Sequence, residues 1–443
     1  MRQKLSLFYL PAFPIIYFDI IKAGAVVVPL SVLLKKEEII YQLKDSDAKA
    51  YCCFTNTAEL PMGENRYTAF KNTISCKLFF MILPDDEMPS SIEGTKTLSN
   101  LMEGQSPQFD MYRSNAEDTC VIIYTSGTTG RPKCAELSHS NLLFNAIISC
   151  GLMDANPNDV SLIVLPLFHI FGMTVMMNAL LYKGGSSVLL PRFDAATVFR
   201  LMQKNKVTVF AGVPTMYWGL LNCIDTSLDY DNIAATLKIC LSGGASLPAQ
   251  VLKDFEKRFN VPIIEGYGMS EGSPVVTFNQ LETGRKQGSI GTTVWGVDVK
   301  LVDAKGKEVP VGEKGELLYR GHNVMKGYYK KPDETALALQ NGWMHSGDIA
   351  IKDEDDFYYI VDRTKDMIIR GGFNIYPREI EEVMIQHEAV SLVAVIGIPH
   401  EEMGEEVKAF VVLKENHSIA AADLIAWTKN LLPPTNIPVT LSF

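Results

Sequence analysis

Short apolar runs rich in β-branched residues recur along the chain, separated by segments whose apolar residues repeat with helical spacing. Such runs suit strands that are buried on both faces, and helices that connect them cover both faces of a parallel sheet. The pattern therefore predicts an α/β fold with a large N-terminal domain of mainly parallel sheets flanked by helices. The predicted strands occupy 120–125, 161–167, 186–191, 207–214, 237–245 and 261–268.

The same alternation is present at the N-terminus, where a strand at 5–10, a helix at 14–25 and a strand at 26–30 predict a βαβ unit. Residues 296–320 instead alternate with period two between turn-forming residues, which is typical of antiparallel strands and predicts a small antiparallel β subdomain. A small α+β C-terminal domain follows. We therefore expect domains at 1–361 and 362–443.

Charge and cysteine content exclude several classes of protein. The chain carries 41 basic and 51 acidic residues, a net charge of -10, so no global field favours nucleic acid as a partner. No apolar stretch is long enough to predict a transmembrane segment. The eight cysteines form no CxxC pair, which indicates free thiols in a reducing compartment and favours a cytoplasmic protein.

A loop rich in glycine and hydroxyl residues follows the strand at 120–125 and precedes Lys133. Glycines allow backbone N–H groups to face phosphate oxygens, hydroxyls add donors, and lysine adds positive charge. The spacing differs from a Walker A loop, and a plain turn stays open on these residues alone. Ser138 or Ser140 is the expected cap of the next helix. The loop residues are Thr125, Ser126, Gly127, Thr128, Thr129 and Gly130.

This loop, YTSGTTGRPK, resembles the phosphate loop of the adenylate-forming superfamily, which contains acyl-CoA synthetases, luciferase-type enzymes and peptide-synthetase adenylation domains. Other motifs that resemble the family follow in the family's order, and among its subfamilies the chain looks most similar to fatty-acid-CoA ligases. These motifs are PLFHIFG (166–172), GVPTMY (212–217), SGGASLP (242–248), EGYGMSE (265–271), GWMHSGD (342–348) and YIVDRTKDMIIRGGFNIYPREIE (359–381).

The resemblance implies an ATP-dependent, AMP-forming ligase that uses Mg2+ and coenzyme A. It assigns catalytic roles to Lys133, Glu271 and His169, with Glu271 as the Mg2+ ligand and Tyr267 stacked on adenine. Taken alone, Glu271 is more simply interpreted as a carboxylate in the first turn of a helix, where the helix dipole favours it. The implied ATP- and AMP-binding residues are Thr125, Ser126, Gly127, Thr128, Thr129, Gly130, Gly244, Ala245, Gly266, Tyr267, Gly268, Ser270, Asp348 and Arg363.

In the C-terminal part, the resemblance makes Asp348 the acceptor for the ribose hydroxyls, Arg363 a second nucleotide contact and Asp362 a hinge. Without the resemblance, these three residues would be interpreted as ordinary turn residues. Gly371 and Gly372 resemble the lining of the channel for coenzyme A, where glycine allows close approach of a thin ligand.

Small and apolar residues at predicted strand ends indicate an acyl pocket lined by Val213, Met216 and Gly243, with Gly268 at its floor. Each buried methylene contributes about 0.8 kcal/mol, which favours a medium- or long-chain fatty acid. His169 would lie against the acyl carboxylate, although a lone histidine among aromatic residues is more often part of a core.

Two alternatives stay open: transfer of the acyl-adenylate to a carrier protein or a luciferase-type oxidation, and a non-catalytic nucleotide- or acyl-binding homologue. Compared with the family, both ends look truncated, and no lysine of the C-terminal TGK type follows. We therefore expect poor adenylation by this chain. A homodimer and a peripheral membrane contact are left open by the sequence.

Overall fold

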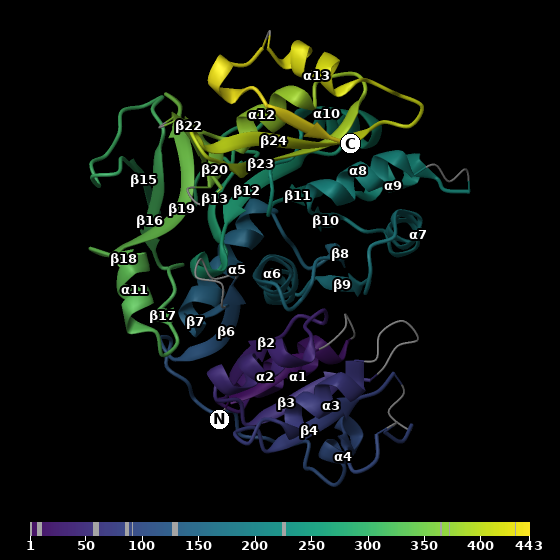
Figure 1. Cartoon of the computed structure of the whole chain (residues 1–443). Coiled ribbons are helices and arrows are strands. Elements are labelled where there is room, and N and C mark those ends of the chain that lie inside the picture. The colour runs from purple at the N-terminus through teal and green to yellow at the C-terminus, as the bar shows by residue number, and fades with distance from the viewer. Residues whose placement is uncertain are drawn as a thin grey trace. The chain divides into compact units, whose positions relative to one another are not determined.

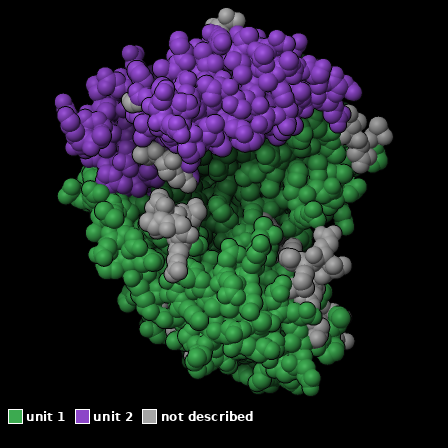
Figure 2. All heavy atoms as spheres, in the orientation of Figure 1, with its two compact units in different colours: residues 1–298, 320–344 green, residues 299–319, 345–443 purple. Residues whose placement is uncertain are grey.

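The computed structural model describes residues 2–6, 11–55, 62–84, 88–90, 92–125, 132–223, 227–363, 366–371, 373–429 and 431–443, with elements labelled as in Figure 1. The chain forms two compact units, coloured separately in Figure 2: unit 1 is Met1–Asp298 with Arg320–Met344, and unit 2 is Val299–Tyr319 with His345–Phe443. The antiparallel segments expected in the N-terminal domain thus group with the C-terminal residues in unit 2. The domain boundary at residue 362 stays a prediction.

The first sheet of unit 1 has eight strands in the order β17-β7-β6-β2-β1-β3-β4-β5. The predicted N-terminal βαβ unit is confirmed, because β1 and β2 pair in parallel and α1 lies between them along the chain, but the first strand begins at Arg2 and not at residue 5, and residues 7–10 lie outside the described residues. The strands are β1 (Arg2–Ser6), β2 (Val26–Pro29), β3 (Ala50–Phe54), β4 (Leu78–Ile82), β5 (Lys96–Thr97), β6 (Thr119–Thr125), β7 (Lys133–Ser138) and β17 (Gly327–Tyr328).

Strand β7 was not predicted. It forms an antiparallel hairpin with β6, in which Thr125 lies opposite Lys133. Helix α5 follows directly, and its first turn is capped as expected, because the Ser138 hydroxyl accepts a hydrogen bond from the Asn141 N–H at 3.1 Å. Lys133 is therefore fixed at the start of a strand whose other end leads into a capped helix.

The second sheet of unit 1 has seven strands in the order β14-β13-β12-β11-β10-β8-β9, and β9, β8, β10, β11 and β12 are parallel as predicted. In a parallel sheet the carboxyl ends lie along one edge, which is where ligands bind in such folds. The strands are β8 (Val160–Ile163), β9 (Ser186–Leu189), β10 (Val209–Gly212), β11 (Ile239–Ser242), β12 (Ile263–Gly268), β13 (Val275–Phe278) and β14 (Thr292–Thr293).

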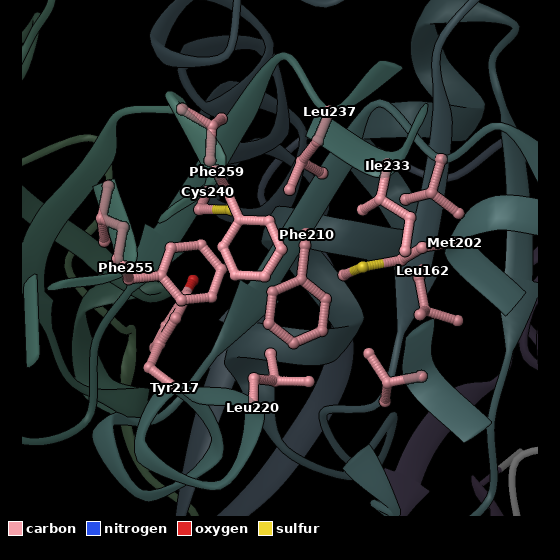
Figure 3. Close-up of a cluster of buried hydrophobic side chains, with 14 of the residues drawn as sticks. Leu162, Met202, Phe210, Tyr217, Leu220, Ile233, Leu237, Cys240, Phe255 and Phe259 are labelled. Carbon is pink, nitrogen blue, oxygen red and sulfur yellow. The ribbon is translucent and has the colours of Figure 1, made fainter. Parts of the chain in front are cut away.

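A large apolar core packs the helices of this part of unit 1 onto the sheet (Figure 3). Leu252, Phe255 and Phe259 lie on one face of α10 because they are three and four residues apart, and all three are buried. The buried Tyr217 hydroxyl of α8 donates to the Leu241 carbonyl oxygen at 2.6 Å, which ties α8 to β11. The core thus fixes the strands that lead into the site.

The helices described in unit 1 are α1 (Ala12–Lys22), α2 (Lys36–Asp45), α3 (Met62–Lys71), α4 (Leu98–Met102), α5 (His139–Leu152), the π-helix η1 (Phe171–Asn178), α6 (Ala179–Lys183), α7 (Ala195–Asn205), α8 (Pro214–Asn222), α9 (Tyr230–Thr236), α10 (Ala249–Phe259), the 3-10 helix η2 (Ser270–Gly272) and α11 (Pro332–Ala338). A short strand, β18 (Leu339–Gln340), pairs with the first residues of β19.

The segment in which period-two alternation predicts antiparallel strands forms two neighbouring strands of one sheet, and an α+β segment with its own apolar core follows in unit 2. Its helices are α12 (Pro377–Met384), α13 (Ala421–Thr428) and the 3-10 helix η3 (Pro434–Asn436). Its strands, of which residues 297–298, 320–321 and 343–344 fall in unit 1, are β15 (Val297–Val302), β16 (Gly315–Gly321), β19 (Trp343–Lys352), β20 (Tyr358–Arg363), β21 (Ile368–Arg370), β22 (Phe373–Ile375), β23 (Val390–His400), β24 (Gly404–Leu413) and β25 (Thr440–Ser442).

All eight cysteines are free thiols, as the sequence predicted; Cys223 is half-buried and the others are buried. Among the helices that the structure describes, none is both long enough and apolar enough to cross a bilayer.

Candidate functional site

The carboxyl ends of β10, β11 and β12 bring glycines and apolar side chains together. Gly212 lies opposite Ser242, and Ser242 opposite Glu265, so the residues that follow each strand meet at one edge of the sheet. A Cβ added at Gly243 would lie 3.3 Å from Cε1 of Phe171 and 3.5 Å from the Gly266 carbonyl oxygen, and one at Gly244 would lie 3.7 Å from Val213. Gly243 is buried and Gly244 is exposed, so the main chain of this turn reaches the surface at Gly244.

The remaining predicted residues of this edge flank that glycine cluster. Ala245 is exposed beside Gly244, and Met216 is half-buried on α8, where its N–H donates to the Val213 carbonyl oxygen at 2.9 Å. Glu265 was not predicted as a site residue, yet its carboxylate accepts from the Leu247 N–H at 2.9 Å and is only 6% exposed. It fastens the turn after β11 to β12.

Tyr267 and Gly268 end β12, and their predicted contacts with the nucleotide stay a prediction. Tyr267 is half-buried and pairs with Thr277, and the register shifts at Gly268. A Cβ at Gly268 would clash with the Pro274 carbonyl oxygen, so only glycine fits. Ser270, half-buried, opens the 3-10 turn that carries Glu271.

His169 follows β8 and precedes the π-helix. The Phe171 N–H donates to its Nδ1 at 3.2 Å, so in the neutral ring the proton is on Nε2, which becomes a donor. Surrounding protein atoms desolvate the ring and lower the pKa of His169 from its ordinary value, although solvent still reaches the side chain. The histidine can therefore donate a hydrogen bond without carrying charge.

Lys133, Tyr328 and Glu271 form a row of three side chains. The Tyr328 hydroxyl donates to Glu271 Oε1 at 2.8 Å, and Lys133 Nζ lies 5.1 Å from the centroid of the Tyr328 ring. The Glu271 side chain is only 5% exposed. Burial of Tyr328, together with the nearby Glu271 carboxylate, raises the pKa of the Tyr328 hydroxyl well above its ordinary value. Within the described part of the chain, Glu271 forms no ion pair.

Thr125 lies opposite Lys133 at the base of the loop that the sequence predicts to bind phosphate. The other predicted loop residues lie outside the described residues: Ser126, Gly127, Thr128, Thr129 and Gly130.

Asp348 in unit 2 is also 5% exposed, but its partner is a cation: Arg363 Nε lies 3.1 Å from Asp348 Oδ1. The strand register of β19 and β20 places the two residues opposite each other. Glu316, which the sequence did not single out, braces the turn before Asp348 by accepting from the Gly347 N–H and contacting His345 Nδ1, both at 3.1 Å.

Asp362 and Gly371 also lie in unit 2. Asp362 accepts from the N–H groups of Arg363 at 2.7 Å and Arg378 at 3.2 Å, so it caps the first turn of α12. Burial raises the pKa of Asp362. Gly371 has a φ of 55°, and its N–H donates to the Met403 carbonyl oxygen at 2.8 Å. Gly372 lies outside the described residues.

The residues around Glu271 meet the requirements of Mg2+. In the described residues, no three His, Cys, Asp or Glu side chains converge into a protein cage for a metal. Mg2+ needs no such cage, since it usually takes one or two carboxylates together with phosphate oxygens and water. A buried carboxylate with one oxygen held by a neutral hydroxyl fits that role.

Comparison with protein families matches residues 5–329 to the AMP-binding enzymes and residues 379–443 to the C-terminal domain of AMP-binding enzymes. The chain is 34% identical over 451 residues to a long-chain-fatty-acid-CoA ligase of Bacillus subtilis, with 98% of this chain and 80% of the relative covered. It is also 34% identical over 439 residues to a feruloyl-CoA synthase of Amycolatopsis, with 98% and 82% covered.

Among solved structures, the chain resembles O-succinylbenzoate coenzyme A synthetase of Bacillus subtilis in complex with ATP and a magnesium ion. The TM-score is 0.82 at 26% identity, and the match covers 99% of this chain and 85% of that one. The likeness therefore extends over both units of the fold.

Proposed function

The chain belongs to the family of AMP-binding enzymes and is an AMP-forming acid-thiol ligase, and we propose that it activates a medium- or long-chain fatty acid and transfers it to coenzyme A. One observation carries the choice of acid: the glycines and apolar side chains gathered at the ends of β10, β11 and β12. Such a lining accommodates an apolar chain better than a charged one.

The proposed reaction has two steps. An oxygen of the acid's carboxylate attacks the α-phosphorus of ATP, and pyrophosphate leaves with the electron pair of the broken P–O bond. The thiolate of coenzyme A then attacks the acyl carbon, and AMP leaves as the C–O bond breaks. Both steps build negative charge on phosphate oxygens, which fixed cations and hydrogen-bond donors stabilise.

We assign the phosphate end to the row formed by Lys133 and Glu271 in unit 1. The lysine would neutralise charge on departing pyrophosphate, and Glu271 would hold Mg2+, which polarises the phosphoryl oxygens when it is bound. Hydroxyls of Thr125 and Ser270 would add donors to phosphate oxygens. The loop Ser126 to Gly130 keeps its predicted role in cradling phosphate.

Several predicted residues are assigned here to the nucleoside, each on its own chemistry. Tyr267 is the proposed stacking partner for adenine, beside main-chain contacts from Gly244, Ala245, Gly266 and Gly268. Asp348 would accept the two ribose hydroxyls, which suits an acceptor-only carboxylate, and Arg363 would hold its orientation.

Asp362 is proposed as the hinge between the two half-reactions, separating domains at 1–361 and 362–443. Gly371 and Gly372 would line the channel for the thiol-bearing arm of coenzyme A. The cap that Asp362 provides to α12 supports a role in holding this segment, and the positive φ at Gly371 suits a tight turn.

The acid pocket would be lined by Val213, Met216 and Gly243, with neutral His169 donating from Nε2 to the substrate carboxylate. No base is needed, because a fatty acid's carboxylate is already ionised at neutral pH. The eight free thiols support a cytoplasmic location, where disulfides are rare. Homodimer formation and a peripheral membrane contact stay predictions.

The test is a panel of straight-chain acids from C2 to C18 together with ferulate, each offered with ATP, Mg2+ and coenzyme A. We expect AMP and the acyl-CoA to form in equal amounts, with kcat/KM rising towards longer chains. Preference for ferulate would contradict the fatty-acid proposal, because a relative of equal identity carries that name. Replacing coenzyme A by a carrier protein tests the acceptor.

A further inference from the structure

Tyr328 lies between the two residues assigned to the phosphate end of the site. Its hydroxyl donates to Glu271 at 2.8 Å, and its ring lies under the Lys133 ammonium at 5.1 Å. No motif in the sequence pointed to this tyrosine, which is 57 residues from Glu271 along the chain. One side chain therefore touches both a carboxylate and a cation that the proposed function needs.

The main chain fixes this arrangement from two sides. Tyr328 lies opposite Ala135 in the antiparallel pair of β17 and β7, and Ala135 points to the same face as Lys133 because side chains alternate along a strand. The Met325 N–H donates to the Glu271 carbonyl oxygen at 2.9 Å, and the Tyr328 N–H donates to the Thr335 hydroxyl at 2.8 Å. The tyrosine is thus held in register with both neighbours.

The contacts have separable chemical consequences. A hydroxyl that donates to one carboxylate oxygen orients the group and leaves the other oxygen for a cation. An aromatic face attracts an ammonium without neutralising it, so the lysine keeps its full charge for phosphate.

We propose that Tyr328 is a positioning residue that orients the Glu271 carboxylate towards the metal-triphosphate and holds the Lys133 ammonium beside it. The inference rests on the proposed function, since it takes the roles of Glu271 and Lys133 from there. The hydroxyl of Tyr328 then contributes to the affinity for the metal, and its ring contributes to the affinity for ATP in the absence of metal.

Two variants separate these parts. Tyr328→Phe removes the hydroxyl and keeps the ring, and we expect it to weaken binding of Mn2+ in the presence of ATP by about 10- to 100-fold, measured by electron paramagnetic resonance. Binding of ATP without metal, measured by calorimetry, should not change. Tyr328→Leu should weaken both, because the lysine loses the aromatic face.

Tyr329→Phe is the matched control. Tyr329 is the next residue, and its hydroxyl also donates to a carboxylate, that of Asp47, at 2.6 Å. The Tyr329→Phe variant should leave the affinity for Mn2+ unchanged. In a Glu271→Gln background, Tyr328→Phe should cause no further loss of metal affinity, since the oriented carboxylate is already gone.

Equal Mn2+ affinity in wild type and Tyr328→Phe would overturn the inference, as would an equal loss in Tyr329→Phe. If Tyr328→Phe does not fold, as judged by circular dichroism, Tyr328→Leu, which also lacks the hydroxyl, tests the same contact and should also weaken metal binding. If the wild-type protein forms no acyl-CoA with any acid, the proposed function fails. If the wild-type protein is active but the Tyr328 variants bind Mn2+ and ATP as tightly as it does, this inference alone fails.

Discussion

Glu271 in unit 1 and Asp348 in unit 2 are equally buried carboxylates, each 5% exposed, with different partners. Glu271 accepts from the neutral Tyr328 hydroxyl, whereas Asp348 pairs with the Arg363 guanidinium. Among the described residues no cation pairs with Glu271, so its charge is uncompensated there, which favours a cation as ligand. A carboxylate that already has a cation can instead accept hydrogen bonds from uncharged hydroxyls at little electrostatic cost. Burial alone therefore does not define a carboxylate's role.

Glu271→Gln should have the largest effect, because it removes the uncompensated charge and keeps the shape. We expect acid-dependent pyrophosphate release to fall by about 100- to 1000-fold, the range for losing one electrostatic contact to a transition state. Thioester formation from supplied acyl-AMP is the control and should persist. Pyrophosphate release within a few-fold of wild type would contradict the assignment.

Asp348→Asn should come second. We expect affinity for ATP and for AMP to fall together by about 10- to 100-fold, with or without metal, because hydrogen bonds to a charged group are lost. Calorimetric titration with each nucleotide measures this. Asp298→Asn is a matched control, since Asp298 Oδ2 pairs with Arg320 Nε at 2.9 Å but both side chains are exposed. If Asp348→Asn lowered the affinity only for metal-bound ATP, Asp348 would act through the metal as Glu271 is proposed to do, and the assignment to the ribose would be wrong.

Glu316→Gln should be milder, since the amide retains one acceptor for the Gly347 N–H but changes the contact with His345. We expect KM for ATP to rise by about 2- to 10-fold, the size of one hydrogen bond, with KM for the acid unchanged. Glu313→Gln, in an exposed turn of the same unit, is the control. If KM for both substrates rose together, Glu316 would support the fold and not specifically Asp348.

The sequence predicted the framework of the site well where the signal is local. The runs at 207–214, 237–245 and 261–268 correspond to β10, β11 and β12 because strands buried on both faces require continuous apolar residues. Ser138 was a correct cap because capping depends on the next three residues.

The parts that the sequence missed depend on distant pairing. Strand β7 is defined by its hairpin partner, and Tyr328 meets Glu271 across 57 residues. Glu316 reaches His345 across 29 residues. Such contacts leave no periodic pattern, so even an assigned motif such as EGYGMSE does not reveal what holds its carboxylate in place.

His169 sharpens the comparison, because its pKa is displaced by desolvation alone, without a charged partner. Since the folded state lowers the pKa of His169 below the ordinary 6.5, the unfolded chain binds this proton more readily. Its contribution to stability is present above pH 6.5 and is lost as pH falls through the lower folded value. Histidine resonances followed by NMR, assigned with His169→Asn, should show a midpoint below 6.5. A midpoint at or above 6.5 would mean that part of the His169 population carries charge near neutral pH, which would contradict its proposed role as a neutral hydrogen-bond donor in the acid pocket.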